Sequence, residues 1–74
     1  MDIQRLLKLI VSSNHKDRDL AEALVESLIR DEQTETLIQI NAQLTGYHDL
    51  FHYEVISTKQ RVEKKIKAYV STIH

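Results

Sequence analysis

The stretch LFHYEVISTKQRVEKKIKAYVSTI, residues 50–73, decides the fold class of this chain. Seven of its side chains, most of them apolar, follow one another at steps of 4, 3, 4, 4, 3 and 4 residues. The average step is close to the roughly 3.6 residues of a helical turn and far from the two-residue period of a strand. Neither proline nor glycine interrupts the run. We therefore predict a long amphipathic C-terminal helix with a stripe made of Phe51, Val55, Thr58, Val62, Ile66, Tyr69 and Ile73.

This helix would be too long for the rest of the chain to cover. About 25 residues at about 1.5 Å each span roughly 37 Å, whereas the whole protein has only 74 residues. The uncovered part of the stripe would need a partner. We therefore predict that the helix contacts a second copy of the chain or another protein through Phe51, Val55, Val62, Ile66, Tyr69 and Ile73.

Length and composition indicate a single helical domain over residues 1–74. The chain has one glycine, no proline and no cysteine. This composition favours unbroken helices over a turn-rich β-fold, and it excludes disulfides and cysteine-based metal sites. A domain of this size buries only a little over half of its unfolded surface, so its stability is marginal. We expect a homodimer, because oligomerisation is a common aid to such small domains.

The apolar segments are too short for a membrane span. None approaches the roughly 18 residues required, and the longest, residues 6–11, is interrupted by Lys8. Nothing at the start resembles a signal peptide, so we expect a cytoplasmic protein. A weaker alternative is that residues 2–13 form an amphipathic helix that lies on a membrane surface, with Arg5 and Lys8 near the lipid headgroups.

The first half of the chain also has helical periodicity. We predict a first helix over residues 2–13 and a second one that runs to about Arg30, capped by Asp17 or Asp19. Residues 30–36 are polar but contain no helix breaker. They allow two interpretations: a short turn with Thr34 capping a third helix, or a solvated turn of one continuous helix. Residues 37–44 continue the apolar stripe in either case.

Gly46 is the only glycine, and it divides residues 19–73 into two nearly equal segments. We expect it to end a helix in the left-handed conformation. The predicted fold is therefore all-α, with three to four helices. It is a helical hairpin bent at Gly46, with the first helix packed across it and a long amphipathic C-terminal helix.

Two local features leave alternatives open. Asn41 lies on the apolar stripe, where a polar residue can set the register of a packing seam, although a place at the edge of the stripe is the simpler interpretation. Residues 36–40 and 51–56 are rich in β-branched and aromatic side chains. A β-hairpin there is a weaker alternative, because short runs of this kind are ambiguous.

Charge is distributed unevenly along the chain. Residues 17–54 contain nine acidic residues against two arginines, whereas residues 55–74 contain five basic residues against one glutamate. The basic face formed by Arg61, Lys64 and Lys65 could follow a nucleic-acid backbone. It could also be a solvated face or pair with the acidic middle of the chain, which we favour because the protein as a whole carries a net charge of −1.

Two histidines have the spacing of metal ligands on a helix. His48 and His52 are four residues apart in the sequence HDLFH. This spacing resembles the HExxH pattern of zinc proteases, but Asp49 replaces the usual glutamate and no third ligand is evident. We treat both histidines as weak metal candidates, and we predict neither a metal nor another cofactor.

No nucleophile has an activating partner at a defined spacing, and no glycine-rich loop is present to bind phosphate. The hypothesis that the sequence supports best is a non-enzymatic helical interaction module, an adaptor, inhibitor or regulator of a larger protein. It would dimerise in the manner of a coiled coil. A nucleic-acid-binding regulator is the alternative, and a catalytic role is the weakest of the three.

Overall fold

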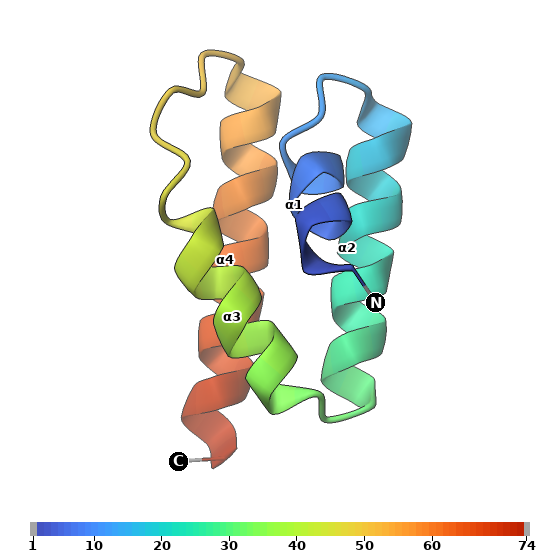
Figure 1. Cartoon of the computed structure of the whole chain (residues 1–74), viewed down its shortest axis with the longest axis vertical. Coiled ribbons are helices and arrows are strands. Elements are labelled where there is room, and N and C mark those ends of the chain that lie inside the picture. Colours follow the sequence, from blue (N-terminus) through green and yellow to red (C-terminus); the bar gives the residue numbers. More distant parts are fainter. Residues whose placement is uncertain (1, 74) are drawn as a thin grey trace.

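The computed structural model describes residues 2–73, which form four helices connected by short segments (Figure 1). The helices are α1 (Ile3–Ile10), α2 (His15–Arg30), α3 (Thr34–Leu44) and α4 (Tyr53–Ile73). They run alternately up and down, with α1 and α3 in front of α2 and α4 in the view of Figure 1. The predicted all-α class is confirmed. The β-hairpin alternative is wrong, because no strand occurs within residues 2–73.

Side chains of the expected type start the first two helices, but not always at the expected position. The carboxylate of Asp2 accepts a hydrogen bond from the backbone N–H of Gln4 at 3.0 Å. The amide oxygen of Asn14 accepts one from the N–H of Lys16 at 2.9 Å. Asn14, and not Asp17 or Asp19, is therefore the cap of α2, which starts earlier than predicted.

Residues 31–33 form a turn that separates α2 from α3. The N–H of Gln33 donates to the carbonyl of Leu28 at 3.0 Å, and the N–H of Glu32 donates to the carbonyl of Ile29 at 3.1 Å. This pair of bonds is the Schellman motif, which requires a left-handed residue at the position of Glu32. Glu32 adopts a φ of 55°. The continuous-helix interpretation is thus wrong, and Thr34 is the first residue of α3 rather than its cap.

Gly46 lies in the connection between α3 and α4, residues 45–52, but it is not left-handed. The prediction for its conformation is therefore wrong. A methyl group at this position would lie 3.2 Å from the carbonyl oxygen of Gln43, closer than ordinary packing. The glycine thus fits a tight approach of two backbone segments, whereas the strained conformation belongs to Glu32.

The stripe of α4 packs inside the bundle. Val55, Thr58, Val62 and Ile66 are buried, and Tyr69 and Val70 pack against the core at its edge. The helix has 21 residues, about 31 Å at about 1.5 Å per residue, close to the 33 Å long axis of the molecule. The helix therefore spans nearly the whole length of the molecule, and its stripe is buried from Val55 to Ile66. The contribution of the other helices to the core is Leu6, Leu7, Ile10, Ala21, Val25, Leu28, Leu37, Ile40 and Leu44.

One buried charge connects the α1–α2 turn to the start of α4. Arg18 is 6% exposed and donates to the carbonyl oxygen of Ser12 at 2.8 Å. Its other terminal nitrogen lies 3.5 Å from the carboxylate of Glu54, in the first turn of α4. The guanidinium thus links the α1–α2 turn to the start of α4.

Within residues 2–73, no helix is long and apolar enough to cross a membrane.

The left-handed turn after α2 leads to a stability prediction. We expect Glu32→Gly to stabilise the protein by about 0.5–1 kcal/mol, because a glycine avoids the clash of a Cβ atom in this conformation and loses only part of that gain to chain entropy. Glu32→Ala is the matched control and should give no comparable gain, since it keeps the Cβ atom. Urea denaturation of the three proteins measures the difference. Equal stabilisation by both variants would contradict this account.

Candidate interaction surface

The residues predicted to contact a partner fall into two groups. Val55, Val62 and Ile66 are 3%, 0% and 1% exposed, because the other helices of the same chain cover them. A second molecule cannot reach them without opening the bundle. The interface predicted for these three residues is therefore corrected: they belong to the core of the single chain.

The remaining members of the predicted interface lie near the ends of α4. Phe51 is 90% exposed and precedes the helix, which begins at Tyr53 rather than near Leu50. Ile73, at the end of the helix, is 48% exposed. Tyr69 is half-buried, and its hydroxyl lies 2.9 Å from the hydroxyl of Thr34, which ties α4 to the start of α3. Only the two ends of the predicted stripe thus remain available to another molecule.

The basic face of α4 lies beside the acidic face of α2. Arg61 contacts Glu22 at 2.7 Å, and Lys65 contacts Glu26 at 2.7 Å and Glu22 at 3.6 Å. Because both short pairs join residues 39 positions apart, one helical turn from each other, α2 and α4 run parallel in register. Pairing with the acidic middle of the chain, one of the alternatives for this face, is confirmed for Arg61 and Lys65.

These ion pairs shift the pKa values of the groups they join. The hydrogen bond and charge of Lys65 hold the pKa of the Glu26 carboxyl below its ordinary value. The hydrogen bond to Glu26 raises the pKa of the Lys65 ammonium, and the hydrogen bond to Glu22 raises the pKa of the Arg61 guanidinium. All these groups lie at or near the surface, so their effect on stability is modest and is screened by salt.

The two histidines do not form a pair on a helix. His48 and His52 lie in the connection of residues 45–52, and both are exposed. The helical spacing that suggested a metal site therefore does not apply. No group of three or more side chains with metal-binding atoms comes together in the described part of the chain.

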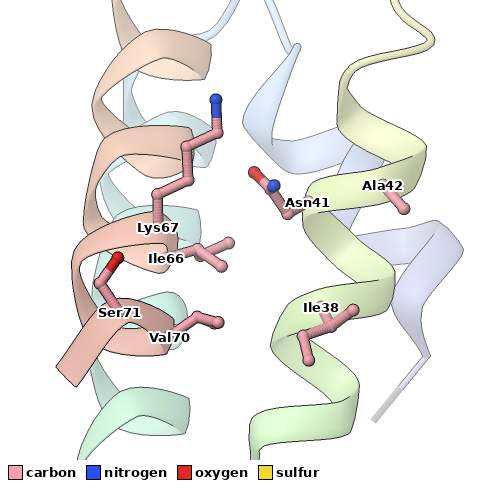
Figure 2. A pocket seen from close by; sticks show the side chains of 7 residues that line it. All are labelled: Ile38, Asn41, Ala42, Ile66, Lys67, Val70 and Ser71. Atoms are coloured by element: carbon pink, nitrogen blue, oxygen red, sulfur yellow. The ribbon is translucent and has the colours of Figure 1, made fainter. Parts of the chain in front are cut away.

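An open, mostly apolar groove of about 520 Å³ lies between α3 and α4. Figure 2 shows Ile66 and Val70 pointing from α4 toward α3, and Asn41 pointing from α3 toward α4. Ile38, which also lines the groove, is 43% exposed. The remaining lining residues are Ala42, Lys67 and Ser71.

One polar atom in this groove lacks a partner. The Oδ1 atom of Asn41 is shielded from solvent, and it accepts no hydrogen bond from any group within residues 2–73. A buried acceptor without a hydrogen bond costs about 1–3 kcal/mol. Asn41 is only partly buried as a residue and lines the groove. The edge-of-stripe interpretation from the sequence fits this position.

One lysine lines the α4 side of the groove, and a second lies beside it. Lys67 lines it, and Lys64 lies one turn earlier in an adjoining hollow that also includes Lys67 and Ser71. Both lysines are exposed, and neither lies within ion-pair distance of a carboxylate in residues 2–73. Lys64 is the one member of the predicted basic face that does not pair with α2. Helical periodicity did not single out Ile38, Lys67 and Val70, because they lie beside the apolar stripes and not on them.

A second open groove lies between α1 and α2. Its lining includes Leu9, Leu20 and Leu24, and Leu20 is 52% exposed. Both signs of charge occur at this groove, which also includes Asp2, Arg5 and Asp17. It therefore lacks the one-sided charge of the α3–α4 groove.

Comparison of the chain with protein-family models, with curated proteins and with solved structures gave no match.

The position of Ile66 in the core leads to a second prediction. Ile66→Val should lower the free energy of unfolding by about 0.5–1.5 kcal/mol, as is usual for a methylene removed from a core. The loss should not depend on protein concentration, because the contacts lie within one chain. Ile73→Val is the matched control, and it should cost less because Ile73 is 48% exposed. Denaturation at two protein concentrations tests this. A loss of unfolding free energy that depends on concentration would show that Ile66 lies in a dimer interface.

The ion pairs between α2 and α4 lead to a prediction about pH. The Glu26 carboxyl has a lowered pKa, so its stabilising contribution is present above its unfolded pKa and is lost as the pH falls through the folded value. NMR titration of Glu26 should show this lowered pKa. Lys65→Met should move it back up, whereas Lys64→Met should leave it in place. An unchanged titration of Glu26 in Lys65→Met would show that the pair does not form in solution.

Proposed function

We propose that this protein is a non-enzymatic helical interaction module that binds a larger protein through the α3–α4 groove. The observation that carries the proposal is an open apolar groove with an unsatisfied polar atom and unpaired lysines on one side. Exposed apolar surface bordered by polar groups is typical of protein-binding sites. A regulator or adaptor of a larger protein fits a chain of this size.

The shifted ionisable groups support a non-catalytic role. The groups with shifted pKa values, Glu26, Arg61 and Lys65, owe the shifts to ion pairs that join α2 to α4 across the surface. A catalytic group is more often shifted by burial in a cleft. The three groups thus hold two helices in register, and we assign them a structural role.

The same ion pairs weaken the nucleic-acid alternative. Two of the three side chains of the predicted basic face, Arg61 and Lys65, already contact carboxylates of α2. A phosphate backbone would have to compete with Glu22 and Glu26 for them. The homodimer predicted from the sequence also loses support, because Val55, Val62 and Ile66 are core residues of one chain. We therefore propose a different protein as the partner.

The proposal is tested by affinity capture from an extract of the source cells, with and without nuclease. The tagged wild-type protein should retain one stoichiometric protein after nuclease treatment. Ile38→Asp should abolish its capture, because the change places a carboxylate at the wall of the α3–α4 groove. Leu20→Asp, which changes an aliphatic residue of similar exposure at the α1–α2 groove, should leave capture unchanged.

Circular dichroism should first establish that both variants keep the helical content of the wild type. Loss of the partner with Leu20→Asp but not with Ile38→Asp would assign binding to the other groove. Capture that disappears on nuclease treatment would favour the nucleic-acid alternative.

A further inference from the structure

The two lysines beside the α3–α4 groove, Lys64 and Lys67, carry charge that no carboxylate of residues 2–73 neutralises. The other basic residues in the middle of α4 are paired: Arg61 with Glu22, Lys65 with Glu26, and Lys59 with Glu63 at 3.5 Å. Lys64 and Lys67 stand three residues apart, so their side chains are neighbours on the surface of the helix. Together they give one side of the groove a positive charge.

The groove offers side chains and not backbone groups for recognition. It lies between two helices, α3 and α4, whose backbone polar groups already bond within each helix. Adding a strand requires a free sheet edge, which this face lacks. The binding mode that fits a groove between two helices is an amphipathic helix that inserts apolar side chains into it. Ile38, which is 43% exposed, and the partly buried Val70 provide the apolar wall for such side chains, with Ile66 beneath them in the core.

Asn41 adds a polar requirement to this apolar site. Its Oδ1 atom is buried and accepts no hydrogen bond within residues 2–73. A donor on a bound segment, such as a serine, threonine or asparagine side chain, would satisfy it once the Asn41 side chain turns toward the groove. The residue thus weakens the free protein and favours a bound one.

We propose that the α3–α4 groove binds an amphipathic helix whose apolar ridge is flanked by carboxylates that face Lys64 and Lys67. This inference rests on the proposed function and specifies the chemistry of the partner. The carboxylates lie on the α4 side of the bound helix, and a hydrogen-bond donor faces Asn41. Charge complementarity of this kind selects the partner and its orientation.

The probes are three synthetic helical peptides with the same leucine ridge and one serine on its edge. The residues that flank the ridge are glutamates in the first peptide, glutamines in the second and lysines in the third. A fourth peptide has the composition of the first in an order that destroys the ridge. Fluorescence anisotropy measures their binding to the 74-residue chain at low and physiological salt.

We expect the glutamate peptide to bind about tenfold more tightly than the glutamine peptide, as for two exposed ion pairs. The lysine peptide should bind most weakly, and the reordered peptide should not bind. The preference should shrink as salt increases. Ile38→Asp should abolish binding of the glutamate peptide, and Leu20→Asp should not.

Two sets of variants test the named side chains. The double variant Lys64→Glu/Lys67→Glu should reverse the preference, so that the lysine peptide binds more tightly than the glutamate peptide. The control Lys8→Glu/Lys16→Glu changes the net charge equally on α1 and α2 and should preserve the original order. Asn41→Leu should raise the thermal midpoint of the free protein while it weakens binding of the serine-containing peptides.

The outcomes separate this inference from the proposed function. If all three ridge peptides bind equally and Ile38→Asp abolishes binding of each, the groove is a docking site but the acidic partner is wrong. If Ile38→Asp leaves binding unchanged, or if none of the ridge peptides binds, both the groove and its acidic partner are wrong. If Asn41→Leu stabilises the protein without weakening binding, the hydrogen-bond part of the inference is overturned.

Discussion

The structure depends above all on the packing of the α4 stripe against the other three helices. Val62 and Ile66 are at most 1% exposed and lie in the same core as Leu7 and Ile40. Burying a side chain of this kind contributes about 1.5–3 kcal/mol. Within residues 2–73, no second core cluster exists to compensate for its loss. The position of this stripe therefore decides where the other helices lie and which surfaces remain open.

The ion pairs on the surface follow from this packing, and they favour one alignment of α2 along α4. With α4 placed, Glu22 and Glu26 of α2 face Arg61 and Lys65, one turn apart on each helix. A shift of α2 along α4 by one turn would leave one member of each helix unpaired. Exposed pairs add little stability, but they favour one parallel register of α2 and α4 over its neighbours.

The unsatisfied features gather on one face, which is where we place function. Core packing leaves the α3–α4 groove open, and the ion pairs leave Lys64 and Lys67 free of carboxylates within residues 2–73. The buried Oδ1 atom of Asn41 lies at the same face and destabilises the free chain. Under the proposed function, such a site would sacrifice stability for binding, as functional positions often do. Elsewhere, the left-handed Glu32 has a local explanation in the turn that it completes.

The sequence by itself determined the all-α class, the existence of the C-terminal helix and the stripe that becomes its buried face. These features follow from periodicity, which is a local property of the chain. Tertiary structure decided what covers the stripe, because neighbours distant in the sequence place Val62 and Ile66 inside the monomer and not at a dimer seam. It also decided which bases are free: the sequence grouped Lys64 with Lys65, but only Lys65 faces Glu26. The groove at Ile38 and Val70 lies between two helices, so no pattern within either helix could indicate it.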